Sequence, residues 1–168
     1  MKVFRKLLVS AFLCIIFSGL YANASAQRVT VLIETLKCDE GKIIHPVHVD
    51  VSIFDADNIS EIMKVVKNLR STLDQVNSDP NAIQKAEIIF SQLQKLVATT
   101  PSLARLRNLP TPEYRFQIPL VKRIVVFAFE KSEFDSFAYA MKELDISSKN
   151  TNNATLNFSS EVECKGAK

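Results

Sequence analysis

Apolar and polar positions begin to alternate near residue 29. Residues 29–36 (VTVLIETL) are rich in β-branched side chains, and residues 38–42 (CDEGK) carry turn chemistry. In residues 47–53, valine and isoleucine alternate with polar side chains, which is the period of a strand with one buried and one solvated face. The pattern predicts a β-hairpin whose second arm has a wet face.

Past Asp55 the apolar period changes from two to 3.6, which predicts helices. Asp57 or Asn58 can cap the first helix, and Asp79-Pro80 opens the second. The apolar stripes are Ile59, Ile62, Met63, Val66, Leu69, Leu73 and Val76, then Ile83, Ala86, Phe90, Leu93 and Val97. Such stripes can dock a partner, but we expect this helical hairpin to bury them on its own domain. A short third helical turn is expected from Thr100-Pro101 through Leu106.

The last third of the chain returns to strand patterns. Residues 114–118 alternate, residues 124–129 (IVVFAF) are continuously apolar, and residues 156–162 alternate again. The continuous run is typical of a strand buried on both faces, so it should be central to its sheet. Residues 134–145 fit a helix or a strand, and their place between two strong strands favours the strand. Asp135 and Tyr139 also have the spacing of a tyrosine corner.

These elements predict an α+β fold, mainly an antiparallel β-sandwich of the immunoglobulin or transthyretin-like kind, with a helical hairpin inserted at about 58–107. Residues 1–26 have the features of a cleaved signal peptide, namely basic residues, a roughly 14-residue apolar run and Ala24-Ser25-Ala26. The run is shorter than the ~20 residues of a membrane span. We therefore expect cleavage after Ala26, a single domain at 27–168, no membrane span in the mature chain, and a secreted or periplasmic location.

Removal of the leader balances the charge. The full chain has 21 basic and 18 acidic residues, and the leader holds three basic residues and no acidic one, leaving 18 of each. A neutral chain without clustered lysine and arginine does not favour nucleic-acid binding. The partner we expect is another protein or a cell-envelope component.

Two cysteines remain after the leader, Cys38 and Cys164. Paired cysteines are usual in exported proteins, and this pair would close a loop of roughly 126 residues, worth about 4 to 5 kcal/mol by chain entropy. A reactive thiol or a metal ligand is the alternative, but neither cysteine has a CxxC motif or a histidine nearby in sequence. We predict a disulfide between them.

The segment HPVHVDVSIFD (45–55) holds both histidines and is the best candidate for chemistry. On a regular strand His48, Asp50 and Ser52 share a face at steps of about 6.6 Å. A triad needs the histidine between the nucleophile and the acid, and here Asp50 is in the middle. A zinc site needs further ligands, and His45 would point to the opposite face. We therefore expect no catalytic residue, metal or cofactor in this strand.

Residues 38–57 (CDEGKIIHPVHVDVSIFDAD) resemble the early hairpin of transthyretin-like and carboxypeptidase-regulatory-like β-sandwich modules. The shared features are a Gly-Lys turn and a V-x-V-x-hydrophobe-Phe-Asp strand. The resemblance implies a non-catalytic exported module used for adhesion, binding or assembly, and it carries over no binding residue. The inserted helices are also similar to those of the sandwich lipoproteins of contractile secretion machines, whose lipid signal this leader lacks.

Glycine is scarce, which bears on enzymology. Only Gly41 and Gly166 follow the leader, so the chain has no glycine-rich phosphate loop, dinucleotide fingerprint or G-x-S-x-G elbow. We expect an exported, non-catalytic interaction protein. The alternative is a small secreted hydrolase or metal-dependent enzyme whose site is assembled only in three dimensions. Asn58, Asn153 and Asn157 are glycosylation acceptors in a eukaryote and carry no such meaning in a bacterium.

Overall fold

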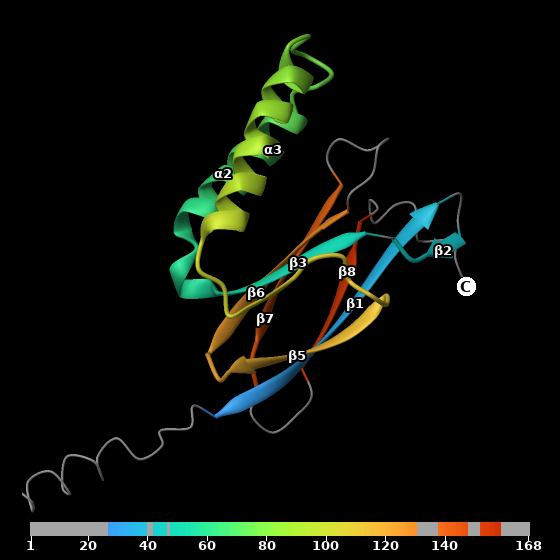
Figure 1. Cartoon of the computed structure of the whole chain (residues 1–168). Coiled ribbons are helices and arrows are strands. Elements are labelled where there is room, and N and C mark those ends of the chain that lie inside the picture. The colour runs from blue at the N-terminus through green and yellow to red at the C-terminus, as the bar shows by residue number, and fades with distance from the viewer. Residues whose placement is uncertain (1–26, 40–41, 47, 131–137, 148–151, 159–168) are drawn as a thin grey trace, which may run out of the picture.

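A computed structural model of the chain describes residues 27–39, 42–46, 48–130, 138–147 and 152–158, and shows the α+β composition that the sequence predicts (Figure 1). The elements are, in chain order, β1 (Arg28–Asp39), β2 (Lys42–Ile44), β3 (Val49–Asp55), a 3₁₀ turn (Ala56–Asn58), α2 (Ser60–Leu73), α3 (Ala82–Thr99), β4 (Ala104–Leu106), β5 (Glu113–Pro119), β6 (Arg123–Glu130), β7 (Tyr139–Asp145) and β8 (Asn152–Asn157).

The strands form two four-stranded sheets. In the first sheet β1 pairs with β2, β5 and β8, and in the second the order is β4-β3-β6-β7. Among the described strands, five of the six pairs are antiparallel, whereas β8 runs parallel to β1 from the pair Val31 and Asn152 to the pair Leu36 and Asn157. The prediction of a mainly antiparallel arrangement is thus confirmed, with one parallel exception.

The two sheets share one apolar core. Side chains of a strand alternate between its faces, so every second residue of β1, β3, β5, β6 and β8 points into the space between the sheets. The buried members of this inner core are Val29, Val31, Ile33, Val49, Val51, Ile53, Phe116, Ile118, Ile124, Val126, Ala128, Ala140, Ala154 and Leu156.

A layer of two helices covers the other face of the second sheet (Figure 1). A second apolar cluster joins helix to sheet, and its buried members are Phe54, Ile59, Ile62, Val66, Leu69, Ala86, Phe90, Leu93, Val97, Val125, Phe127 and Phe129. The predicted helical hairpin is therefore present, and most of its apolar stripe is buried on its own domain. Ile83 is an exception with 52% exposure, because the neighbouring Ala82 takes the buried position instead.

The helical layer corrects the expectation of a wet face on β3. Ser52 is only 6% exposed and Phe54 is fully buried, on the face that the alternation assigned to solvent. The polar positions of β3 predicted a solvated surface, but residues 60–99 fold back over them. An alternating pattern shows which face of a strand is more polar. It does not show whether another part of the chain packs against that face.

The boundaries of the early hairpin also differ from prediction. β1 does pair with a second arm, but this arm is the three-residue β2, and its register pairs Lys37 with Ile44. The chain then leaves the first sheet, and β3 begins at Val49 in the second. His48 has φ 57°, a left-handed conformation that ends any regular extension before β3.

Strand predictions in the last third agree more closely. β6 is buried from Ile124 to Phe129 and lies between β3 and β7, so its central position is confirmed. Residues 139–145 are a strand, as favoured, while 134–137 lie outside the described residues. β8 begins at Asn152, before the predicted 156–162, and Val162 is outside the described residues. The expected helical turn through Leu106 is wrong, because β4 pairs there with β3.

Candidate functional site at the tip of the helical hairpin

Both histidines lie in the connection between β2 and β3, where neither belongs to a strand. His45 follows β2, and its Nδ1 lies 3.1 Å from the carbonyl oxygen of Thr35. His48 is exposed and precedes β3, so the expectation that both histidines belong to one regular strand is wrong. Within the described ranges, no three His, Cys, Asp or Glu side chains are grouped as a metal site would require.

Asp50 and Ser52 have structural partners in the segment that follows α3. The carboxylate oxygen Oδ1 of Asp50 accepts the backbone N–H of Asn108 at 2.9 Å. Ser52 Oγ accepts a hydrogen bond from Nε of Arg105 at 3.1 Å. Asn108 has a left-handed φ of 53°, and Asp50 stabilises the turn at that point. These two contacts hold residues 105–108 against β3 at the edge of the second sheet.

Arg105 also fixes the base of the helical hairpin. Its guanidinium donates to the carbonyl oxygens of Val97 at 2.6 Å, Ala98 at 2.7 Å and Thr100 at 3.0 Å. The last carbonyls of a helix have no partner inside the helix and carry the negative end of its dipole. One cation therefore satisfies the C-terminus of α3 while its Nε holds β3.

Aromatic contacts hold the hairpin on the sheet nearer its middle. The ring of Phe90 in α3 lies 5.9 Å from that of Phe129 in β6 and 6.0 Å from that of Tyr139 in β7, centroid to centroid. Phe54 and Phe127 meet edge to face at 6.0 Å below the same layer. Edge-to-face rings at these distances add to the stabilisation from burial alone.

Beyond these contacts the hairpin projects past the sheets (Figure 1). Thr72 and Ala82 are buried near the far end, and Ala82 belongs to neither of the two apolar clusters. Small buried residues at this end allow the two helices to pack on each other without the sheet. Ile83, next to Ala82, is half exposed on the projecting part.

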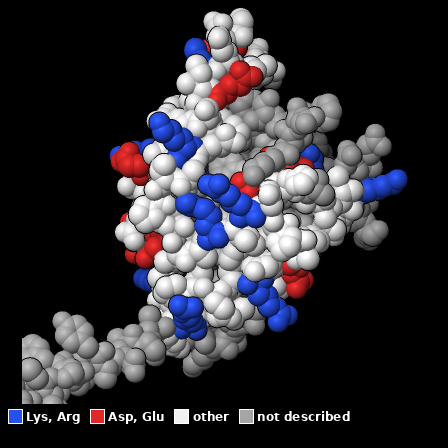
Figure 2. Space-filling view, viewed as in Figure 1, with Lys and Arg blue, Asp and Glu red and all other residues white. Residues whose placement is uncertain are grey.

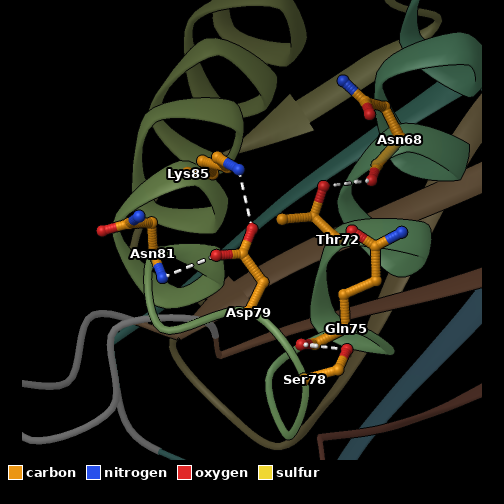
Figure 3. Close-up of polar contacts among 7 residues, drawn as sticks. All are labelled: Asn68, Thr72, Gln75, Ser78, Asp79, Asn81 and Lys85. Atoms are coloured by element: carbon orange, nitrogen blue, oxygen red, sulfur yellow. Dashed lines mark hydrogen bonds and ion pairs between the residues drawn. The ribbon is translucent and has the colours of Figure 1, made fainter.

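The residues that connect the helices, here called the tip (74–81), form a compact set of hydrogen bonds (Figure 3). The carbonyl oxygen of Gln75 accepts the backbone N–H groups of Ser78 and Asp79, each at 2.9 Å, and the hydroxyl of Ser78 at 3.1 Å. Asp79 Oδ1 accepts the N–H of Asn81 at 2.9 Å, and its Oδ2 accepts from Nζ of Lys85 at 2.7 Å. The bonds to Gln75 and Asn81 lie within the tip, and the contact with Lys85 joins the tip to α3.

Asp79 is the charged centre of this arrangement. The hydrogen bond from Lys85, then that from the Asn81 backbone, lowers the pKa of its carboxyl below the ordinary value of 3.8. Both contacts favour the ionised carboxylate, so it accepts both hydrogen bonds at neutral pH. Lys85 and Asp79 balance each other in charge, and the tip presents the amides of Asn77 and Asn81 as exposed polar groups.

Elsewhere the surface carries both signs of charge. On the face seen in Figure 2, several lysine and arginine side chains lie together near the middle, and further basic and acidic side chains are scattered around them. Among the described ion pairs, Arg123 joins Asp57 at 3.3 Å and Glu143 at 3.0 Å on the surface of the second sheet. Such exposed pairs each contribute little to stability.

The sequence pointed to part of the tip. Asp79-Pro80 predicts the start of the second helix, but α3 begins at Ala82 with Asn81 as its N-cap, and Asp79 instead forms a local turn with Asn81. The sequence did not predict the contact with Lys85, because a residue six positions ahead becomes a neighbour only when the turn folds back onto the helix. An acidic residue before Pro with a lysine in the first turn of the following helix is the signal that could have found it.

The other predicted sites have different outcomes. The proposed Cys38–Cys164 disulfide lies outside the residues whose side chains are described. Asn58 and Asn153 are exposed, and Asn157 is half-buried at the end of β8. Among described helices, none combines the length and apolarity needed to cross a bilayer.

Comparisons with known proteins found little similarity. No family model matches the chain, and no curated protein matches it. Among solved structures, the crystal structure of the T6SS lipoprotein TssJ1 from Pseudomonas aeruginosa is similar to this chain with a TM-score of 0.35. The sequences are 13% identical, and the match covers 79% of this chain and 89% of that one.

Proposed function

We propose that this protein is an exported, non-catalytic interaction protein of the cell envelope or extracellular space, and that the projecting end of its helical hairpin contacts a partner protein. The observation that carries the proposal is the tip itself. It extends past the sheets, it is ordered by its own hydrogen bonds, and it carries the exposed Asn77 and Asn81, with the half-exposed Ile83 following at the start of α3. Exposed apolar side chains together with polar groups are common in protein contact surfaces.

The base of the hairpin supports the same proposal. Arg105 fixes the end of α3, and Phe90 packs it on the sheet, so the projecting part is carried by a rigid support. Sites on rigid elements hold their geometry better than sites on free loops. The hairpin accordingly presents its tip in a defined direction.

Export and fold type belong to the proposal as well. The signal-peptide features of residues 1–26 support export, and the mature chain is expected to begin at Gln27. N-terminal sequencing of the protein from its native compartment tests this, and a chain that retains Met1 would contradict it. We assign the two sheets to the transthyretin-like sandwich type on the motif of residues 38–57, and a solved structure with a different strand connection would refute that assignment.

Site-specific photo-cross-linking in the source organism tests the contact. A photoreactive amino acid replaces Asn77 at the tip, and the control places it at Arg115, which is exposed on β5 of the first sheet. We expect one discrete protein adduct from position 77 and none of the same mass from position 115. Equal adducts from both positions, or none from the tip, would refute the proposal.

Two matched variants then locate the contact. Ile83→Ser changes the exposed isoleucine next to the tip, and Ile88→Ser changes another exposed isoleucine of α3, which is 66% exposed and farther from the tip. We expect Ile83→Ser to lower the yield of the position-77 adduct several-fold and Ile88→Ser to leave it unchanged. Both side chains are already in solvent, so neither change should lower the free energy of unfolding by more than about 0.5 kcal/mol.

A further inference from the structure

We propose that the outer edge of β5 pairs with the same strand of a second copy of this chain, so that the first sheets of two molecules join into one continuous antiparallel sheet. This inference is independent of the contact proposed for the hairpin tip. Among the described strands, β5 lies at the end of the first sheet and pairs with β1 alone. The backbone groups on the other side of such an edge strand can pair with another chain.

The hydrogen bonds to β1 show which backbone groups of β5 point outward. The N–H of Leu120, just after the strand, bonds to the carbonyl oxygen of Gln27 at 2.7 Å. Residues of an antiparallel strand direct their N–H and C=O groups alternately towards and away from the neighbouring strand. Even-numbered residues of β5 therefore face β1, and the backbone groups of Glu113, Arg115 and Gln117 point to the outer edge.

Two of these residues carry exposed charges on the outer face of the sheet. Phe116 and Ile118 are buried in the inner core, so Glu113 and Arg115 point to the opposite face. The register places Glu113 directly opposite Glu34 of β1, and like charges in such positions are unfavourable. Among the ion pairs of the described residues, none includes Glu113 or Arg115. A cation placed at the outer edge would therefore stabilise these two carboxylates.

A second copy supplies that cation by symmetry. A two-fold axis perpendicular to the sheet, centred beside Tyr114, pairs the two strands antiparallel and keeps their outer faces on the same side. Glu113 of each copy then lies directly opposite Arg115 of the other, with Cβ atoms about 5 Å apart. Both residues direct their backbone groups to the edge, so these two pairs also exchange about four backbone hydrogen bonds. The edge is thus complementary to itself in charge and in hydrogen bonding.

The edge strand of the second sheet is less suited to such pairing. β7 lies at the end of that sheet, and its Lys142 pairs in register with Val126 of β6. Val126 belongs to the inner core, so Lys142 lies on the core-facing side of its strand. A charge on the inward face of an edge strand opposes the addition of another strand. The charges of β5 instead lie on its outer face, where they can pair.

Sedimentation velocity of the purified protein over a series of concentrations tests the proposal. We expect a monomer–dimer equilibrium for the wild type. Arg115→Glu places two carboxylates opposite each other at both ends of the interface, and it should raise the dissociation constant of the dimer at least about tenfold. The double variant Glu113→Arg/Arg115→Glu exchanges the two charges, and it should restore the dissociation constant to within about threefold of wild type.

Two control variants show that the effect belongs to this edge. Lys67→Glu makes the same change of net charge on an exposed residue of α2, and Ile83→Ser changes the exposed isoleucine of the hairpin. Both should leave the dimer unchanged. Arg115 is exposed and in no described ion pair, so circular dichroism should show the same fold in Arg115→Glu as in the wild type.

Three results would overturn the proposal. The first is a wild-type chain that stays monomeric over the whole series. The second is a double variant that dimerises as weakly as Arg115→Glu. The third is a dimer that is lost in Ile83→Ser and kept in Arg115→Glu, which would place the contact on the helical hairpin. The adduct from position 77 reports separately on the proposed function, and it should be the same in Arg115→Glu as in the wild type.

Discussion

At the scale of single residues, two charged side chains form hydrogen bonds with backbone groups at the two ends of α3. Arg105 satisfies three carbonyl groups at the end of α3, and Asp79 satisfies an amide at its beginning. Both ends of a helix leave backbone groups without partners, so a single side chain there has more effect than an ion pair on an open surface.

Arg105 should therefore contribute measurably to stability. Arg105→Met removes the donors to Val97, Ala98, Thr100 and Ser52, and we expect the free energy of unfolding in urea to fall by about 2 kcal/mol. Arg105→Lys keeps the charge but not the planar set of donors, so it should recover only part of the loss. Arg107→Met is the matched control on an exposed arginine two residues away, and it should change stability by less than about 0.5 kcal/mol. Equal effects of Arg105→Met and Arg107→Met would contradict the role.

The lowered pKa of Asp79 implies that its contribution to the free energy of unfolding depends on pH. A carboxyl whose pKa is lower in the folded state stabilises that state above its unfolded pKa, and the contribution disappears as the pH falls through the folded value. The stability difference between wild type and Asp79→Asn should therefore be constant near neutral pH and shrink below pH 3.8. Urea titrations at several pH values measure it, and a difference that grows on acidification would show the opposite sign.

At the scale of elements, the hairpin is held on the sheet by its buried apolar side chains, of which Phe90 contacts two strands. Phe90 is 7% exposed and contacts rings of both β6 and β7, whereas Ile88 on the same helix is 66% exposed. Burial against the sheet, and not helix propensity, stabilises an amphipathic helix of this kind.

Substitution of these two residues separates the effects. We expect Phe90→Ala to lower the free energy of unfolding by about 3 to 4 kcal/mol, because it leaves a cavity between helix and sheet. Ile88→Ala should change it by less than about 0.5 kcal/mol. Chemical denaturation followed by circular dichroism checks both, and a small effect of Phe90→Ala would mean that the helices do not pack on β6 and β7 as described.

At the scale of the whole molecule, the layers are joined by contacts between residues far apart in sequence. Lys37 at the end of β1 forms an ion pair with Glu130 at the end of β6 at 3.3 Å, and this contact joins the two sheets. Glu130 is only 10% exposed there. Arg105 of β4 bonds to Ser52 of β3, 53 positions away, and its bonds to the carbonyl oxygens of Val97 and Ala98 join the helical layer to the second sheet.

The disulfide between Cys38 and Cys164 is a prediction for the whole chain, because it would close nearly all of the mature protein into one loop. Protein from the native compartment should show no free thiol until reductant is added. Cys38→Ser should then lower the free energy of unfolding by about 4 kcal/mol, through a less restricted unfolded state. Free thiols in the untreated protein, or identical melting with and without reductant, would show that the bridge is absent.

Local patterns predicted the elements well wherever a segment buries one consistent face. The stripes of α2 and α3 and the unbroken run of β6 predicted their type and most of their buried residues. The reason is that burial repeats with the geometry of the element itself, at 3.6 residues in a helix and two in a strand. Asp79-Pro80 predicted where the second helix starts to within two residues, since α3 begins at Ala82.

The relations between elements were decided only in the folded chain. The polar face of β3 is covered because residues 60–99 return over it, β8 joins β1 in parallel, and the two histidines lie in the connection before β3 instead of on the strand. Each of these features depends on contacts between residues that are far apart in sequence. The polarity pattern of one segment does not predict such contacts. The sequence by itself determined most of the helices and strands and their apolar faces, but not β4 or the start of β8. Tertiary packing decided what each face meets, since burial depends on the whole chain and periodicity on a few neighbours.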